Sequence, residues 1–154
     1  WYRRQRQMCI RDRCVVGNPY NAPHEAARKV LAEGLIRLGV ITQNLDEALD
    51  MKSGQLKDWY MHNTSHWIGL DVHDVGVYLP DGKPRLLESG MCLTVEPGLY
   101  FGAWRPDVVC PERYANIGIR IEDDILVTDD GPVVLTDKCP KTIDEIEYIV
   151  GSTV

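Results

Sequence analysis

No apolar run in this 154-residue sequence reaches the roughly 18 residues that a membrane-spanning helix needs. The first residues also lack an apolar segment followed by a small-residue cleavage site, so we expect neither a membrane protein nor an exported one. No two cysteines have the C-x-x-C spacing of a zinc or redox site, and the number of cysteines is odd. The five cysteines are Cys9, Cys14, Cys92, Cys110 and Cys139. Cysteines scattered in this way suit a reducing cytoplasm.

The sequence has no excess of positive charge outside its first thirteen residues. Five arginines against Asp12 give residues 1–13 a charge of +4 and leave −10 on the rest of a chain whose net charge is −6. A basic arm can tether a protein to nucleic acid, but the acidic remainder would repel phosphate, so we expect no nucleic-acid partner. The arginines are Arg3, Arg4, Arg6, Arg11 and Arg13.

The same stretch, WYRRQRQMCIRDR, has no apolar periodicity and is unlike the rest of the chain. Its MCIRDR part resembles the translation of a sequencing adapter. We therefore expect residues 1–13 to be non-native and the natural protein to begin upstream of about Cys14. Residues 14–154 contain no repeat or linker, and a composition of 44% apolar and 26% charged residues is ordinary for one globular domain.

Helix and strand signals are both present. Residues 24–39 place apolar side chains at helical spacing before a glycine, which predicts an amphipathic helix with Ala27, Val30, Leu31, Leu35 and Leu38 on its apolar face. A short helical turn is expected at 44–51, and a capping box of Thr142 and Glu145 opens a last helix at 142–150. Runs of β-branched and aromatic residues predict strands at 58–62, 68–79, 91–96, 116–128 and 132–136.

Strand alternation brings charged residues onto shared faces. In residues 117–122, alternation puts Arg120 and Glu122 together on the face opposite the isoleucines. In the strand at 91–96, Glu96 likewise faces away from the apolar side chains. Two strands would thus offer carboxylates from one polar sheet face. The inward residues would be Ile117, Ile119, Ile121, Leu93 and Val95.

Three of the four histidines, His62, His66 and His73, lie within twelve residues. A glycine and β-branched residues among them argue against a continuous helix, and the H-E-x-x-H spacing of a zinc protease is absent. One imidazole with Glu96 and Glu122 would form an oxygen-rich site. Such a site suits manganese, cobalt or ferrous iron, and zinc also binds such a set.

Each of these residues also has a simpler explanation. A histidine is more often a hydrogen-bonded polar residue than a metal ligand. Glu96 and Glu122 could be solvated strand residues, with Arg120 as the surface partner of Glu122. The residue pattern alone therefore leaves open both a metal or acid–base site and a purely structural role.

The sequence resembles the pita-bread metallopeptidases in three successive motifs, MHNTSHWIGLDVHDVG (61–76), LESGMCLTVEPGLYF (87–101) and NIGIRIEDDILVT (116–128). The TSHWIGLDVHD part is most similar to aminopeptidase P, the Xaa-Pro aminopeptidases, and the resemblance extends from about Pro19 to the C-terminus. It implies an α+β fold in which a curved, mainly antiparallel sheet carries helices on its outer side and the site on its concave face. This chain would hold one half of that duplicated fold and part of the other.

The resemblance implies a centre with two divalent metal ions, manganese first, with cobalt, iron or zinc as alternatives. His66 would be a metal ligand. Glu96 would be a ligand that also acts as base toward the attacking water, and Glu122 would bridge the two metals. Arg120 would organise the carboxylates and help to bind substrate.

The implied substrates are peptides with proline in second position, from which the N-terminal residue is removed. His73 would contact the scissile carbonyl and steady the tetrahedral intermediate, and His62 would lie beside the substrate at the leaving-proline side. Both are therefore expected to be catalytic and substrate-binding residues. The resemblance also implies a homo-oligomeric, cytoplasmic parent protein. Prolidase, which cleaves Xaa-Pro dipeptides, and a non-catalytic pita-bread module that binds peptides are the alternatives.

The chain departs from the family pattern in three places. In the family, two metal-ligating aspartates lie eleven positions apart, ahead of the histidine that corresponds to His66, and this chain has no pair of aspartates at that spacing. We therefore expect residues 14–154 to be a C-terminal fragment of the catalytic domain that binds metal weakly and does not cleave Xaa-Pro peptides alone. Asn63 stands where glycine is usual and Ser89 where proline is usual; asparagine tolerates left-handed backbone angles, so the first change is mild.

Overall fold

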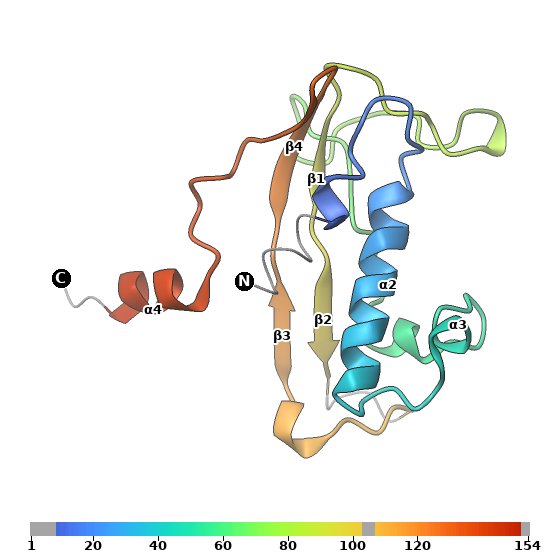
Figure 1. The fold of residues 1–154 in the computed structure, drawn as a ribbon, viewed down its shortest axis with the longest axis vertical. Coiled ribbons are helices and arrows are strands. Elements are labelled where there is room, and N and C mark those ends of the chain that lie inside the picture. Colours follow the sequence, from blue (N-terminus) through green and yellow to red (C-terminus); the bar gives the residue numbers. More distant parts are fainter. Residues whose placement is uncertain (1–8, 103–106, 152–154) are drawn as a thin grey trace.

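The computed structural model describes residues 9–102 and 107–151. Two antiparallel strand pairs lie end to end, helix α2 runs alongside them, and helix α4 stands apart (Figure 1). Residues 9–11 are helical, and the helices that lie wholly within this part of the chain are α2 (Ala22–Arg37), α3 (Leu45–Ala48) and α4 (Ile143–Gly151), with short 3₁₀ helices η1 (Gln55–Asp58), η2 (Pro80–Gly82) and η3 (Glu112–Tyr114). The strands are β1 (Cys92–Val95), β2 (Gly98–Phe101), β3 (Ile117–Arg120), β4 (Asp123–Thr128) and β5 (Gly131–Val134).

The strands form two small antiparallel sheets. β4 lies between β1 and β5 in one sheet, and β2 pairs with β3 in the other. The β4–β5 connection turns at Asp129 and Asp130, and β5 begins at Gly131, whose φ of +114° is open to glycine but strained for other residues. The β1–β4 and β2–β3 pairs supply the frame on which the polar residues are placed.

The two strand pairs are one antiparallel ribbon interrupted at a two-residue gap. The register is the same on both sides, so an unbroken ribbon would pair Glu96 with Glu122. Pro97 has no backbone N–H to donate, which explains why regular pairing stops here. One bond, from the Ile121 N–H to the Pro97 carbonyl at 3.4 Å, crosses the gap. The flanking pairs are Val95–Asp123 and Gly98–Arg120.

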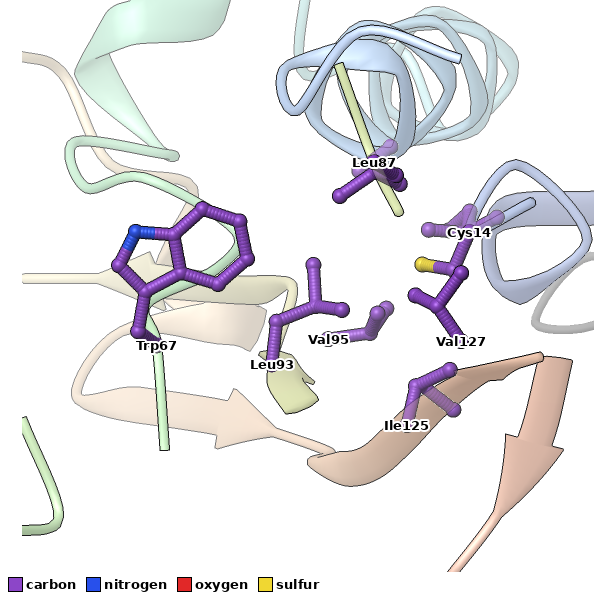
Figure 2. Close-up of a cluster of buried hydrophobic side chains, with 9 residues drawn as sticks. Cys14, Trp67, Leu87, Leu93, Val95, Ile125 and Val127 are labelled. Atoms are coloured by element: carbon purple, nitrogen blue, oxygen red, sulfur yellow. The ribbon is translucent and has the colours of Figure 1, made fainter. Parts of the chain in front are cut away.

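Apolar side chains fill the space between α2 and the strands in two clusters. In the first, Leu93 and Val95 from β1 meet Ile125 and Val127 from β4, and Trp67 closes one side (Figure 2). The inward orientation predicted for Leu93 and Val95 is confirmed, with exposed fractions of 0% and 1%. The second cluster joins the far half of α2 to β2 and the segment around η1: Ala32, Leu35, Ile41, Ala48, Leu56, Trp59, Tyr60 and Phe101.

Helix α2 confirms the predicted amphipathic helix. Ala27 and Leu35 are fully buried, as the spacing predicts. The helix ends at Arg37 because Gly39 takes a φ of +70° and the next N–H, that of Val40, bonds back to the Leu35 carbonyl. Leu38 is therefore outside the helix and 47% exposed, so its placement on the buried face was wrong.

Cys14 lies within the first apolar cluster and is fully buried (Figure 2). Burial, with a smaller effect of Asp12, raises the pKa of its thiol from 9.0 to about 12. The neutral thiol therefore stabilises the fold below the unfolded pKa, and this contribution is lost as the pH rises from about 9 toward 12.

The Cys14 thiol is expected to resist alkylation at pH 8 in the folded protein, since the thiolate is the reactive form. Cys9 and Cys139, which are exposed, are the internal controls and should react first. Mass spectrometry after timed iodoacetamide treatment, with and without denaturant, measures both rates. Equal labelling of Cys14 and Cys139 under native conditions would show that this core is not formed.

Part of the segment expected to be non-native makes contacts with the fold. Ile10 is buried in the first apolar cluster, and Arg11 Nη1 lies 3.1 Å from the buried Asp123 carboxylate. Lys141 Nζ reaches the other oxygen of Asp123 at 3.0 Å. Residues 1–8 lie outside the described residues, and the domain boundary at residue 13 stays a prediction.

The strands predicted at 58–62 and 68–79 were wrong. The first stretch follows η1 as irregular chain, and its aromatic residues, Trp59 and Tyr60, are buried in the second cluster. The second is mostly irregular and highly exposed, with Leu70 fully accessible. β-branched and aromatic residues favour a paired, half-buried surface, and beyond Ile68 no described strand pairs along this stretch.

The predicted strands at 91–96 and 132–136 are confirmed by β1 and β5 with shorter bounds. The stretch at 116–128 forms two strands, β3 and β4, because the ribbon is interrupted at Ile121 and Glu122. β2 was not expected, since the Pro97–Gly98 pair looked like the end of a strand rather than a short gap within a ribbon.

The inward orientation predicted for Ile117 and Ile119 was wrong. These side chains are 42% and 59% exposed, because no described element packs on that face of β3. Alternation fixes which residues share a face, but it does not supply the layer that covers that face.

Helix α4 confirms the predicted capping box. The Glu145 N–H donates to the Thr142 hydroxyl oxygen at 3.2 Å, and the Thr142 N–H donates to Glu145 Oε2 at 3.0 Å. The helix lies away from the sheets, and Ile146 and Val150 are exposed (Figure 1). Among the described helices, none combines the length and the apolar character needed to cross a membrane.

Candidate metal centre

Residues 64–68 run antiparallel beside β1 and place His66 next to it. The Glu96 N–H donates to the Thr64 carbonyl at 2.8 Å, the Thr94 N–H to the His66 carbonyl at 3.0 Å, and the Ile68 N–H to the Cys92 carbonyl at 3.0 Å. Trp67, the neighbour of His66, faces the other way into the first apolar cluster. The alternation of a strand-like segment therefore buries the indole and turns the imidazole toward the carboxylates.

His66, Glu96 and Glu122 form a compact group of donors. One ligand atom from each lies within 4.8 Å of the other two. His66 and Glu96 are partly buried and Glu122 is exposed. The shared register of the two strand pairs explains part of this grouping, because it places Glu96 and Glu122 opposite one another at the gap.

The hydrogen bonds of His66 fix which ring nitrogen faces the carboxylates. Nδ1 lies 3.0 Å from the Trp67 carbonyl, which can only accept, so Nδ1 carries the hydrogen. Nε2 then lies 3.2 Å from Glu96 Oε1. In the neutral ring Nε2 carries a lone pair. At this distance the Nε2 lone pair and the lone pairs of Glu96 Oε1 repel one another unless a cation lies between the two atoms. This arrangement suits a metal ligand oriented by a backbone carbonyl.

Thr94 connects His66 to Glu96. Its side chain is 1% exposed, and its Oγ1 accepts the His66 backbone N–H at 3.0 Å and donates to Glu96 Oε1 at 3.0 Å. The Thr94 hydroxyl thus accepts a hydrogen bond from His66 and donates one to Glu96, the two candidate ligands. One buried residue holds both in their relative positions.

Replacing Thr94 with valine is expected to weaken Mn²⁺ binding by about 10–100-fold, because it leaves Glu96 without an orienting donor and the His66 N–H without an acceptor. Calorimetric titration of the full-length protein with Mn²⁺ measures the change. Thr128→Val is the matched control, since the Thr128 hydroxyl bonds only the β4–β5 turn at the Gly131 carbonyl. An unchanged affinity in Thr94→Val would rule out this role.

Like charges are crowded around Glu122. Burial, followed by the nearby Glu96 and Asp124 carboxylates, raises the pKa of Glu122, while Arg120 and His66 act in the opposite direction. Arg120 Nε lies 3.6 Å from Glu96 Oε2 and 4.0 Å from Glu122 Oε2. One half-exposed guanidinium therefore offsets two carboxylates, which leaves negative charge available for a bound cation.

The remaining histidines lie on two sides of this group. The His73 ring packs edge-on against the His66 ring, with centroids 4.3 Å apart. His62 Nδ1 donates to the Asn63 carbonyl, so its Nε2 accepts the Tyr100 hydroxyl at 3.0 Å. Tyr100 in turn accepts a hydrogen bond from Arg120, and this bond and the neighbouring charges raise the pKa of Arg120.

The structure brings all the sequence-predicted site residues into one region: His62, His66, His73, Glu96, Arg120 and Glu122. Sequence reasoning missed Thr94 and Tyr100 as parts of the site. Thr94 had a signal, because it shares a strand face with Glu96 at a spacing of two. Tyr100 had none, since it lies on the unexpected strand β2.

Residues 3–129 match metallopeptidase family M24, and the chain belongs to this family. It is similar to the Xaa-Pro aminopeptidase of Escherichia coli, with 47% identity over 122 residues, which cover 79% of this chain and 26% of that protein. The Xaa-Pro aminopeptidase of Haemophilus influenzae is 40% identical over 137 residues, 89% of this chain and 30% of that one.

Solved structures of aminopeptidase P share the fold. Pseudomonas aeruginosa aminopeptidase PepP superposes with a TM-score of 0.86 and 41% identity, covering 96% of this chain and 33% of that one. Escherichia coli aminopeptidase P with the inhibitor Pro-Leu gives 0.79 and 40%, over 97% of this chain and 32% of that one. These matches confirm the predicted pita-bread fold. The chain spans about a quarter to a third of the length of the proteins it matches.

Proposed function

We propose that this chain is the C-terminal part of the catalytic domain of a metal-dependent Xaa-Pro aminopeptidase, which removes the N-terminal residue from peptides with proline second. The observation that carries the proposal is the grouping of His66, Glu96 and Glu122 within 4.8 Å, at the gap of an M24 fold. The names of the similar proteins support the substrate class.

His66, Glu96 and Glu122 would hold the divalent metal ions. When bound, these ions would acidify a water molecule and polarise the scissile carbonyl. One nitrogen and two carboxylates make an oxygen-rich set, for which manganese is the first candidate and cobalt, iron and zinc are alternatives.

The chain's own side chains would handle the protons and the developing charge. Glu96 would accept the proton of the attacking water, with Oε1 fixed by Thr94 and Oε2 facing Arg120. His73, edge-on to His66, would donate a hydrogen bond to the scissile carbonyl oxygen as it becomes negative. His62 would lie at the proline side of the bond, where Tyr100 orients its ring.

The activity is tested with the full-length protein loaded with Mn²⁺ and three substrates. We expect release of alanine from Ala-Pro-Ala, with much slower cleavage of Ala-Ala-Ala. Cleavage of the Ala-Pro dipeptide alone would indicate a prolidase. Binding of Ala-Pro-Ala without cleavage of any substrate would indicate a non-catalytic pita-bread module. Either result would overturn the proposal.

The 154-residue chain by itself is expected to bind Mn²⁺ weakly and not to cleave Ala-Pro-Ala, because its described residues group three ligands and its sequence has no pair of aspartates at the family spacing. The measurement is a calorimetric titration with Mn²⁺ and an alanine-release assay beside the full-length protein. Robust turnover by the purified chain would contradict the proposal that further ligands lie elsewhere in the parent protein.

We further propose a cytoplasmic, homo-oligomeric parent protein whose partners are peptides rather than nucleic acid or membrane. The net charge of −6 supports the exclusion of nucleic acid, since an acidic protein repels phosphate. Salt-dependent DNA binding by a variant starting at Val15 would contradict it.

A further inference from the structure

A cavity of about 300 Å³ lies beside His62, between the start of α2, η1 and the chain that follows η1. Its wall includes His24, the one histidine that the proposed reaction does not use, together with Arg28, Lys57, Tyr60 and His62. The cavity is distinct from the group formed by His66, Glu96 and Glu122, since none of these three lines it.

A single imidazole connects this cavity to the candidate metal centre. The His62 ring packs edge-on against Tyr60, which lines the cavity, with centroids 5.1 Å apart. It also packs against Tyr100 at 5.4 Å, and Tyr100 is hydrogen-bonded to Arg120 of the centre. A peptide whose proline lies beside His62 would therefore continue into this cavity after the proline.

The charged side chains that line the cavity sum to +1, because Arg28 and Lys57 stand against one carboxylate, Asp50. Arg28 donates to Glu25 and to the Leu49 carbonyl, and Lys57 donates to the Lys52 carbonyl; both cations have more N–H donors than these bonds use. The pKa of His24 is lowered by burial, so its ring is neutral at pH 7 and the charge comes from the two cations.

The Asp50 carboxylate keeps its charge and is bound within its own turn, where hydrogen bonds from Ser53 and Lys52 lower its pKa and the nearby Lys57 also lowers it. Its Oδ1 accepts the Lys52 N–H at 2.9 Å and both the N–H and the hydroxyl of Ser53 at 2.7 Å. Met51, Leu56 and Met61 supply the apolar part of the wall, and Asn63 adds a polar side chain. A ligand with a short aliphatic stem and an anionic end fits this combination.

We propose that this cavity receives the residue that follows proline in the substrate, and that Arg28 and Lys57 make it selective for an acidic side chain. The proposal rests on the proposed Xaa-Pro aminopeptidase activity. The stem of a glutamate would contact the methionines, and its carboxylate would accept hydrogen bonds from the two cations.

The test measures binding and cleavage separately in the Mn²⁺-loaded full-length protein. Amidated Pro-Glu, Pro-Gln and Pro-Lys are not Xaa-Pro substrates, and calorimetry gives their affinities. We expect Pro-Glu amide to bind about threefold more tightly than Pro-Gln amide, as for a partly exposed ion pair, and Pro-Lys amide to bind most weakly. The kcat/KM values of Ala-Pro-Glu, Ala-Pro-Gln and Ala-Pro-Lys amides should follow the same order.

Variants of Lys57 locate the effect. Lys57→Met should weaken the preference for glutamate over glutamine and leave glutamine binding unchanged, because Arg28 stays in the cavity wall, and Lys57→Glu should favour the lysine peptide. Lys83→Met, an exposed lysine outside the cavity, makes the same charge change and should keep the preference. Equal binding of the three amides to wild type, or a preference that survives Lys57→Glu, would overturn the inference. Failure of the proposed function shows itself differently, as absence of cleavage of every Ala-Pro peptide.

Discussion

Glutamine in place of Glu96 is expected to lower kcat of the full-length protein for Ala-Pro-Ala by about 10²–10⁴-fold. The amide keeps the size of the side chain and one acceptor oxygen, but it cannot take a proton from water. Glu96 is held by Thr94, faces the His66 ring and lies near Arg120, so the substitution removes charge at the centre of the group. Steady-state kinetics at saturating Mn²⁺ measures the effect.

Glu88→Gln is the matched control. Glu88 is exposed and pairs with Arg85 at 3.4 Å, away from the three grouped donors, so its replacement should leave kcat within about twofold, as expected for an exposed ion pair. Activity of Glu96→Gln within tenfold of wild type would exclude Glu96 as the base, whatever its effect on metal affinity.

Alanine in place of Leu93 is expected to lower the free energy of unfolding by about 2–5 kcal/mol. Leu93 is fully buried and pairs with Ile125 on one side and with Trp67 on the other (Figure 2). The cavity left behind would loosen the segment that carries His66, so metal binding should weaken together with stability. Urea denaturation measures the stability difference.

Leu70→Ala is the control for this loss. The same side chain is removed, but Leu70 is fully exposed in the irregular segment after the His66 strand-like stretch, so stability should change by no more than about 0.5 kcal/mol. A similar small change in Leu93→Ala would contradict the core described between α2 and the strands.

Local sequence rules predicted those parts of the fold that local physics decides. Gly39 ends α2 because only a residue that tolerates a positive φ turns the chain there, and Thr142 with Glu145 caps α4 through bonds three residues apart. Alternation correctly turned Leu93 and Val95 inward. These features depend on neighbours within a few positions.

Features that depend on distant partners were missed. In the sequence, Pro97 looks like the end of a strand. Only the shared register of the β1–β4 and β2–β3 pairs shows that β2 continues β1 beyond this gap. Residues 68–79 have strand composition but no described pairing strand beyond Ile68, whereas residues 64–68 pair beside β1 with a weaker signal. Ile117 and Ile119 share a face as expected, yet nothing in the described chain covers it.

The candidate site divides in the same way. Alternation placed Glu96 and Glu122 on polar faces, and the resemblance to a known family placed His66 with them. Residue types could not show that Thr94 also bonds to His66, or that Tyr100 orients His62, because these two contacts bridge residues that are distant in sequence.

The central claim is that His66, Glu96 and Glu122 hold metal together, and anomalous diffraction from crystals of the Mn²⁺-loaded full-length protein tests it most directly. The account predicts an anomalous peak within bonding distance, about 2.0–2.2 Å, of His66 Nε2 and of a carboxylate oxygen from each glutamate. A peak that omits two of these three residues, or Mn²⁺ bound only elsewhere in the protein, would contradict it.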